Sequence, residues 1–121
     1  MTDPATPAPR GPYSPIARAG GWLVTAGQLG MRDGRLLDGV VEQTRQALDN
    51  IRVLLESEGA TLGDVVKTTV LLADIADWPA MNEPYVKAFG EHRPARTAFA
   101  AAGLPAGARV EIEAWAYVGE E

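Results

Sequence analysis

The sequence predicts an α+β domain in which a β-sheet carries two amphipathic helices on one of its faces. Two segments show helical periodicity, and both are flanked by segments that alternate or are rich in β-branched residues. The predicted order is strands, helix, strand, helix, strands. Two helices can cover only one face of such a sheet, so the other face is expected to be open. A length of 121 residues suits a single domain.

The first strands are expected early in the chain. Residues 1–10 are rich in proline and predict a flexible lead-in, followed by one domain over residues 11–121. The segment Trp22–Ala26 is a candidate strand with glycines on both sides. The dipeptide Asp33-Gly34 predicts a hairpin or another tight connection.

Two helices follow. The first is predicted from about Val40 to Glu58, and Gly59 is a natural C-terminal stop. Its apolar face comprises Val40, Thr44, Ala47, Leu48, Ile51, Leu54 and Leu55. The second is predicted after Asp77, which would cap it, and Pro84 predicts that it is short or kinked near its start. Its apolar stripe comprises Trp78, Met81, Tyr85 and Phe89.

The remaining strands are predicted at residues 64–74, 95–101 and 109–118. The last one alternates: Val110, Ile112, Ala114, Ala116 and Val118 share one face, and Glu111, Glu113, Trp115 and Tyr117 share the other. If the helices cover the first face, two large aromatic residues remain exposed on the second. Such exposure indicates a partner surface, and the simplest partner is another copy of the chain. The carboxylates would then lie in a cleft at or near this interface.

The composition excludes several classes of function. A net charge of −5 without a basic run argues against nucleic-acid binding. The chain has no cysteine, which excludes disulfides and thiolate chemistry, and its single histidine, His92, is expected to be solvent-exposed and without a role. No segment predicts a transmembrane helix or a signal peptide, so we expect a cytoplasmic protein without membrane contacts.

Several motifs occur in an order that resembles one known family. They are GPYS (Gly11–Ser14), AGQLG (Ala26–Gly30), QTRQALDNI (Gln43–Ile51), GDVVKTTVLLAD (Gly63–Asp74), MNEPYVKAFGEHRPART (Met81–Thr97) and LPAGARVEIEAWA (Leu104–Ala116). This ordered set resembles the RidA family of reactive intermediate deaminases, also called YjgF proteins. The resemblance extends from about Gly11 to Val118.

The resemblance implies a fold, an assembly and a reaction. The fold would be chorismate-mutase-like, an α+β fold with a mixed sheet and two helices on one face. Members assemble as homotrimers with clefts between neighbouring subunits. Active members hydrolyse 2-imino acids such as 2-iminopropanoate, which forms from 2-aminoacrylate, to 2-keto acids and ammonia, and they use no cofactor and no metal.

Two residues are expected to carry the chemistry. Arg96 matches the family's substrate-binding arginine, and its planar fork suits a bidentate pair with a carboxylate. Glu111 matches the family's catalytic glutamate, which would position water and move protons near the arginine. We assign Glu113 a supporting or interface role. From the residues alone, a solvated strand-end arginine is the favoured interpretation of Arg96, and only the family match reverses that preference. The two glutamates could equally form a charged sheet face or an intersubunit salt bridge.

Four further positions match residues near the family's substrate. Tyr13 would close the cleft, Asn82 would lie beside it, Gly27 would let the backbone approach the ligand, and the backbone near Ala98 would add a hydrogen bond. Three of them also have a purely structural interpretation: Tyr13 as a packed loop aromatic, Asn82 as a first-turn helix residue and Gly27 as the end of a strand.

Some positions depart from the family pattern. Ala26 stands where many members have serine, Trp115 where a smaller aliphatic residue is common, and Phe99 lies in an unusually alanine-rich strand. These differences bear on substrate preference more than on fold.

Three other functions are alternatives for this sequence. A non-catalytic module could bind keto acids or amino acids in the same cleft. A ribonuclease or translation inhibitor fits poorly with the net charge of −5, because RNA binding needs a basic surface. A chorismate mutase must hold a dicarboxylate, and only one arginine is well placed for it.

Overall fold

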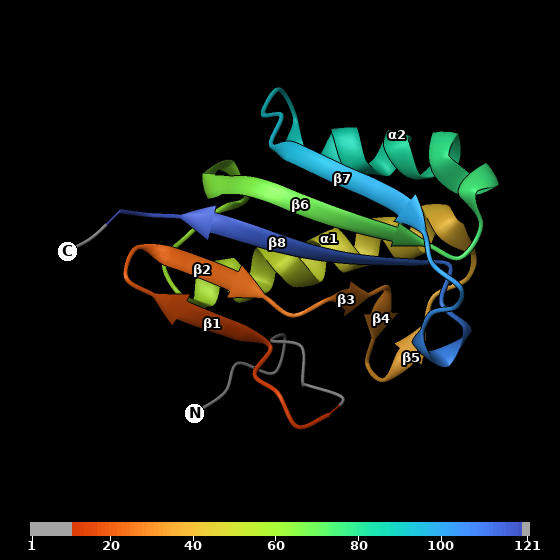
Figure 1. The fold of residues 1–121 in the computed structure, drawn as a ribbon, viewed down its shortest axis with the longest axis horizontal. Coiled ribbons are helices and arrows are strands. Elements are labelled where there is room, and N and C mark those ends of the chain that lie inside the picture. Colours follow the sequence, from red (N-terminus) through yellow and green to blue (C-terminus); the bar gives the residue numbers. More distant parts are fainter. Residues whose placement is uncertain (1–10, 120–121) are drawn as a thin grey trace.

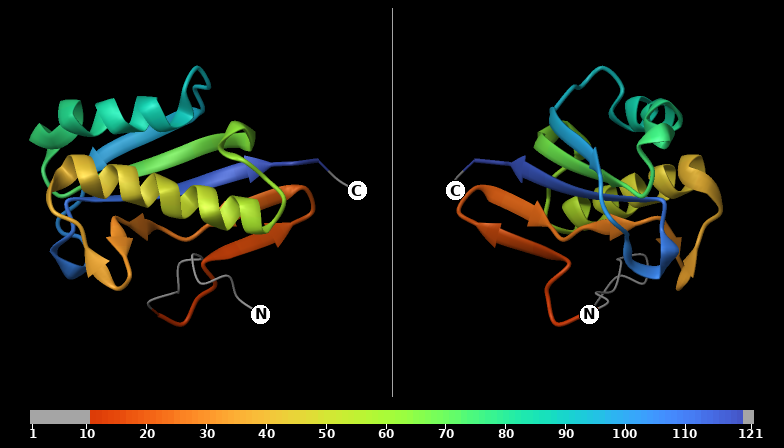
Figure 2. Two further views of the ribbon diagram at one scale, coloured as in Figure 1. Left: turned by 180° about the vertical axis from the view of Figure 1, so that it is seen from behind. Right: turned by 45° about the vertical axis from the view of Figure 1, so that its right-hand side comes forward.

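The computed structural model describes residues 11–119, and it shows a sheet with two helices on one face (Figures 1 and 2). The strand order is β1 (Ile16–Ala19), β2 (Trp22–Thr25), β8 (Val110–Tyr117), β6 (Val65–Leu72) and β7 (Ala95–Ala100), and β3 (Gln28–Leu29) also pairs with β8. Strands β6 and β7 are parallel and the other pairs are antiparallel, so the sheet is mixed. The predicted fold class is confirmed. The predicted lead-in at residues 1–10 lies outside the described residues.

Both helices lie against the same face of the sheet, which we call the inner face (Figure 2). Helix α1 (Gly39–Ser57) and helix α2 (Trp78–Phe89) occur where the periodicity predicted them. Gly59, with φ of +84°, ends α1 in the left-handed conformation that glycine adopts without strain. Neither helix in the described part of the chain is long and apolar enough to cross a bilayer.

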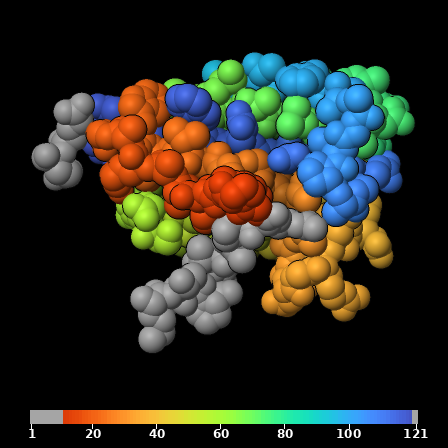
Figure 3. All heavy atoms as spheres, turned by 60° about the horizontal axis from the view of Figure 1, so that its bottom comes forward, coloured from red at the N-terminus to blue at the C-terminus, as the bar shows by residue number. Residues whose placement is uncertain are grey.

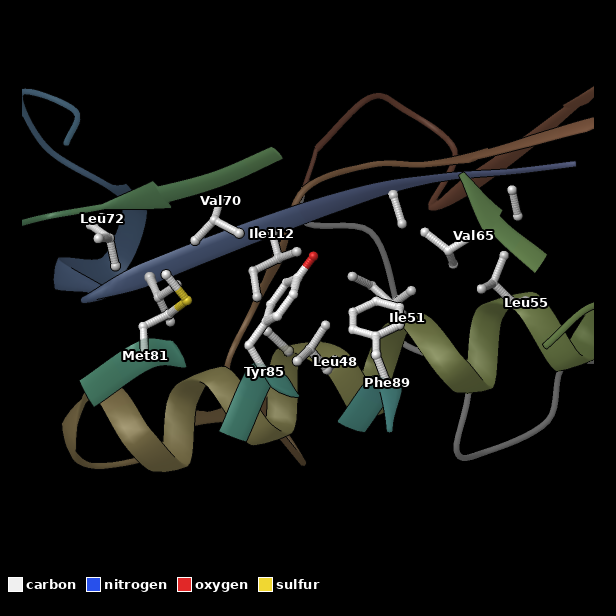
Figure 4. Packing of buried hydrophobic residues seen from close by; sticks show 14 of the residues in the cluster. Leu48, Ile51, Leu55, Val65, Val70, Leu72, Met81, Tyr85, Phe89 and Ile112 are labelled. Atoms are coloured by element: carbon white, nitrogen blue, oxygen red, sulfur yellow. The ribbon is translucent and has the colours of Figure 1, made fainter. Parts of the chain in front are cut away.

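The core fills the space between the helices and the inner face. Figure 4 shows Leu48, Ile51 and Leu55 of α1 and Met81, Tyr85 and Phe89 of α2 packed beneath the sheet. Burying an aliphatic side chain of this size contributes about 1.5–3 kcal/mol, so this layer is the main source of stability. The side chains with almost no solvent exposure include Leu23, Leu48, Ile51, Leu54, Leu55, Val65, Val70, Leu72, Met81, Val110 and Ile112.

One buried polar group is unsatisfied, and it gives a stability prediction. The Oγ1 of Thr44 on α1 has no hydrogen-bond partner in the described residues, although Thr44 is fully buried. Thr44→Val should therefore be neutral or should stabilise the protein by up to about 1 kcal/mol in urea unfolding. Thr25→Val is the matched control, because the equally buried Thr25 accepts a hydrogen bond from the amide of Ala114 at 3.1 Å. It should cost about 1–3 kcal/mol, and equal losses in the two variants would contradict the prediction.

Strand β8 alternates as predicted. Val110, Ile112, Ala114 and Ala116 are buried on the inner face, and Glu111, Glu113, Trp115 and Tyr117 lie on the opposite face, which we call the outer face. The rings of Trp22 and Tyr117 are 5.0 Å apart, and those of Trp22 and Trp115 are 6.2 Å apart. These three residues form an exposed aromatic cluster on the outer face.

The chain between β2 and α1 makes two features that the sequence indicated only in part. Val24 pairs with Trp115 and Gln28 with Ile112, so the β2–β3 side has one residue more than β8 and bulges near Gly27. Strands β4 (Met31–Arg32) and β5 (Arg35–Leu36) form the predicted hairpin around Asp33-Gly34. Both turn residues have positive φ, as a type I′ turn requires. The hairpin projects from the body of the molecule (Figure 3).

The prediction for α2 was right about the N-cap residue and wrong about a short helix. Helix α2 continues through Pro84 for 12 residues and is not short. The hydrogen bond that Pro84 removes belongs to the carbonyl of Ala80, an exposed residue, so water can replace it. Asp77 is the N-cap residue, but its side chain makes no cap hydrogen bond. It instead pairs with Arg109, whose Nη2 lies 2.8 Å from Oδ2.

His92 is not the exposed loop residue that the sequence predicted. It is partly buried beside Phe89, and its Nε2 lies 2.7 Å from the carbonyl oxygen of Val65. The contact ties the segment after α2 to the start of β6. Short 3₁₀ turns complete the other connections, at η1 (Leu62–Asp64), η2 (Ile75–Asp77) and η3 (Pro105–Gly107).

Candidate active site

Arg96 lies on the inner side of the edge strand β7, against α2. The register pairs Arg96 with Thr68, a fully buried residue of β6, so its side chain is directed toward the helix layer. Its Nη1 donates a hydrogen bond to Oδ1 of Asn82 at 2.8 Å. Its guanidinium carbon lies 5.4 Å from the ring centroid of Trp78 and 4.7 Å from that of Tyr85. The aromatic rings and the amide therefore hold the guanidinium in one place.

The environment of Arg96 is unusual because the described residues place no acidic partner in it. Within residues 11–119, the ion pairs of the protein involve Arg18, Arg45, Arg52 and Arg109 but not Arg96. The hydrogen bonds of Arg96 in this range come from Nη1 alone, so the Nε–Nη2 edge is not engaged. A partly buried cation without a counter-ion is costly. An anion that approaches this edge would gain a bidentate, charge-assisted contact.

Glu111 lies on the outer face of β8, beside the bulge at Gly27. A Cβ placed on Gly27 would lie 2.1 Å from Oε2 of Glu111, so only glycine leaves room for the carboxyl group in this position. The carboxyl is partly buried, and this desolvation raises its pKa. The negative charge of Glu113 raises the pKa of Glu111 further. A carboxyl with a raised pKa is suited to accept and return protons near neutral pH.

The predicted residues thus fall into two groups in one chain. Arg96 and Asn82 contact each other between β7 and α2, and Ala98 lies two residues further along the same side of β7; we call this the arginine half-site. Glu111 and Gly27 contact each other on the other side of the sheet; we call this the glutamate half-site. Within one chain, Arg96 and Glu111 therefore lie on opposite sides of the sheet.

Two further predicted residues lie outside these contacts. Tyr13, in the segment before β1, is 48% exposed. Glu113 lines a shallow depression of about 360 Å³ on the outer face, together with Lys67, Thr69, Val66 and the rings of Trp22 and Trp115. This position agrees with a supporting or interface role for Glu113 and separates it from the contact between Glu111 and Gly27.

The sequence predicted Trp78 and Tyr85 only as members of the apolar stripe of the second helix. The structure places both against Arg96, and the hydroxyl of Tyr85 lies 2.6 Å from Oγ1 of Thr68. The available signal was the position of Asn82, four residues after Trp78 and three before Tyr85, which puts a polar residue inside an aromatic helix face. In the described residues, no group of three or more histidine or acidic side chains is arranged to hold a metal ion.

Comparison with known proteins identifies the family of this chain. The model of the family described as Endoribonuclease L-PSP matches residues 4–118. The crystal structure of RidA from the Antarctic bacterium Psychrobacter sp. superimposes with a TM-score of 0.92 at 37% identity, covering 98% of each chain. The chain belongs to the RidA family. The match also confirms the chorismate-mutase-like fold that the resemblance implied.

Two curated relatives of this RidA-family chain carry different names. The goat (Capra hircus) protein, named 2-iminobutanoate/2-iminopropanoate deaminase, is 47% identical over 93% of this chain and 85% of its own length. A RutC family protein of Pyrococcus horikoshii is 46% identical over 92% of this chain and 90% of its own length. The relatives therefore include a protein named for imine deamination and one with a family name alone.

Proposed function

We propose that this RidA-family chain hydrolyses 2-imino acids, such as 2-iminopropanoate, to 2-keto acids and ammonia. One observation carries the proposal: among residues 11–119, the partly buried guanidinium of Arg96 has no acidic partner, and no hydrogen bond uses its Nε–Nη2 donor edge. A small acid with a carboxylate next to the reacting carbon satisfies that cation. The name of the goat relative supports the same substrate class.

The reaction needs one water molecule and one proton carrier. Ionised Glu111 would take a proton from water while the water oxygen bonds to the carbon of the protonated imine, giving a neutral carbinolamine. The protonated Glu111 would then donate its proton to the carbinolamine nitrogen. The regenerated carboxylate would take the hydroxyl proton as the C–N bond breaks and the C=O bond forms, and it would pass this proton to the departing ammonia, so that the 2-keto acid and ammonium leave. Burial suits Glu111 for both steps because its raised pKa lets it hold a proton for part of the cycle. Protons and charges balance without a cofactor.

The two half-sites can act on one substrate only if they come from different chains. Arg96 lies on the inner side of the sheet and Glu111 on the outer face, so the sheet itself separates them. The exposed aromatic cluster of Trp22, Trp115 and Tyr117 supports self-association through the outer face. We propose a homotrimer in which each cleft combines the arginine half-site of one chain with the glutamate half-site of its neighbour.

The remaining predicted residues have roles in this cleft. Asn82 orients Arg96 through the 2.8 Å hydrogen bond to Nη1. Gly27 leaves space for the Glu111 carboxyl and for the substrate beside it. Ala98 lies next to Arg96 on the same side of β7, where its backbone can hydrogen-bond the substrate. Tyr13 would close the cleft from the segment before β1.

A coupled assay tests the proposal. An amino-acid oxidase generates 2-imino acids in the presence of semicarbazide, and semicarbazone formation is followed with and without the protein. We expect the protein to suppress semicarbazone formation for at least one small, branched or aromatic imino acid, because hydrolysis competes with trapping. No suppression for any of them, combined with tight binding of 2-keto acids, would replace the enzyme by a binding module that uses the same cleft.

A further inference from the structure

We infer that Trp78 and Tyr85 are positioning residues that stabilise the Arg96 guanidinium in place of an acidic side chain, which leaves its donors available to the ligand carboxylate. The inference rests on the proposed function for the identity of the ligand. It concerns two residues that the sequence placed only in the core, and it assigns them a part in substrate affinity.

The contacts of Arg96 are with neutral groups. The ring centroids of Trp78 and Tyr85 lie 5.4 and 4.7 Å from the guanidinium carbon, within the distance of a cation–π interaction. The only side-chain oxygen within the described residues that accepts from Arg96 is the amide oxygen of Asn82. The sulfur of Met81, 3.9 Å from Nη1, completes this neutral environment.

Arg109 in the same chain shows what an acidic partner does. Its Nε lies 3.1 Å from Oδ2 of Asp77, and its Nη2 lies 2.9 Å from Oδ1, so Asp77 occupies the edge that a ligand carboxylate would need. An aromatic ring stabilises a cation through its π face and consumes no N–H donor. Arg96 therefore keeps a free Nε–Nη2 edge, whereas Arg109 does not.

Tyr85 is fixed so that its ring can serve this role. It is 4% exposed, and its hydroxyl lies 2.6 Å from Oγ1 of Thr68, the residue that pairs with Arg96 across β6 and β7. Figure 4 shows the Tyr85 hydroxyl directed from α2 toward the sheet. Burial raises the pKa of Tyr85, which keeps the phenol neutral beside the cation. Helix α2 thus presents Trp78, Asn82 and Tyr85 to one guanidinium.

The test compares substitutions that remove the ring with those that keep it. For Trp78→Leu we expect KM for 2-iminopropanoate to rise about 3- to 30-fold with kcat within about twofold of wild type, because the cation is stabilised less while the chemistry at Glu111 is unchanged. Trp78→Phe should restore most of the affinity. Tyr85→Phe keeps the ring and should raise KM less than Trp78→Leu. Val86→Ala, an exposed change on the same helix, is the matched control and should leave KM unchanged.

A second substitution tests the competition directly. Asn82→Asp is nearly isosteric and puts a carboxylate at the Asn82 position, 2.8 Å from Nη1. It should raise KM more than Asn82→Ala does, because the new carboxylate competes with the ligand for Arg96. A smaller effect of aspartate than of alanine would overturn the inference, as would an unchanged KM in folded Trp78→Leu.

Binding of pyruvate, measured by calorimetry on the same variants, separates this inference from the proposed function. If the wild type shows no turnover but binds pyruvate, and Trp78→Leu and Asn82→Asp weaken that binding, the proposed activity fails and the inference stands. If turnover is present and neither variant changes KM or pyruvate affinity, the inference fails and the activity stands. A folded wild type that neither turns over substrate nor binds pyruvate would overturn both.

Discussion

Arg96→Ala and Glu111→Gln are each expected to lower the rate of imine hydrolysis about 100-fold or more. When the two variants are unfolded and refolded together, about a quarter of the wild-type activity should return. The single losses follow from removing the carboxylate anchor or the proton carrier. The recovery follows from the sheet, which separates Arg96 from Glu111 in each chain. A cleft in the mixed oligomer is intact when it takes Arg96 from one variant and Glu111 from the other, which random assembly gives in about one cleft in four.

The control for this experiment is a mixture with both changes in the same half-site. Arg96→Ala refolded with Asn82→Ala should recover no more activity than the better variant alone, because every cleft still lacks one arginine half-site residue. Native mass spectrometry would show whether mixed oligomers form. If they form and the first mixture stays inactive, the cleft between two chains is wrong.

Glu111→Gln is expected to make the folded protein more stable at neutral pH while it abolishes turnover. Desolvation, followed by the charge of Glu113, raises the pKa of Glu111 above its value in the unfolded chain. The folded state therefore binds this proton more tightly than the unfolded state does. The contribution of Glu111 to stability is fully present below the unfolded pKa, near 4.3, and is lost as the pH rises through the folded pKa. Glutamine is uncharged at every pH and avoids this loss.

Urea unfolding between pH 4 and pH 8 measures this effect. The stability difference in favour of Glu111→Gln should grow with pH across that window and then become constant. A glutamine variant that is less stable than wild type at pH 7 and pH 4 alike would show that the ionised carboxyl is stabilised by contacts and not penalised by burial.

The pH profile of kcat/KM supplies the matching functional measurement. Activity should rise with pH as Glu111 ionises, with the acidic limb above the ordinary range of a glutamate. Glu113→Gln removes the neighbouring charge, so it should move this limb to lower pH and retain activity. An unshifted limb in that variant would show that another group controls it.

Local patterns were enough to predict most of the fold. The seven apolar positions on the first helix determine its inner face, and all of them are buried. The alternation of β8 determined which side chains point away from the helices, and Trp115 and Tyr117 are exposed as expected. Strand β3 was missed because it is only two residues long. Strand β1 was missed because its sequence, Ile-Ala-Arg-Ala, has one β-branched residue, whereas the equally short β2 contains Trp22, Val24 and Thr25. Their pairing with β2 and β8 makes them strands.

The candidate site was predictable only in part. The sequence identified Arg96, Asn82, Gly27 and Glu111, and the structure shows two contacting pairs among them. It could not show which pairs form, because the alternation of β8 predicts that Glu111 faces away from the helices, whereas the alanine-rich β7 gives no such signal for Arg96. That choice is made by the register between strands, which matches Thr68 with both Arg96 and Ala114.

By itself, then, the sequence determined the helices, the long strands and the open outer face, because these depend on near neighbours in the chain. It also identified the candidate residues for binding a carboxylate and for moving a proton. The tertiary structure alone decided that Trp78 and Tyr85 surround Arg96, that Glu111 lies over Gly27, and that the two half-sites lie on opposite sides of one sheet. These contacts join residues far apart in sequence, and only strand pairing and helix packing bring them together.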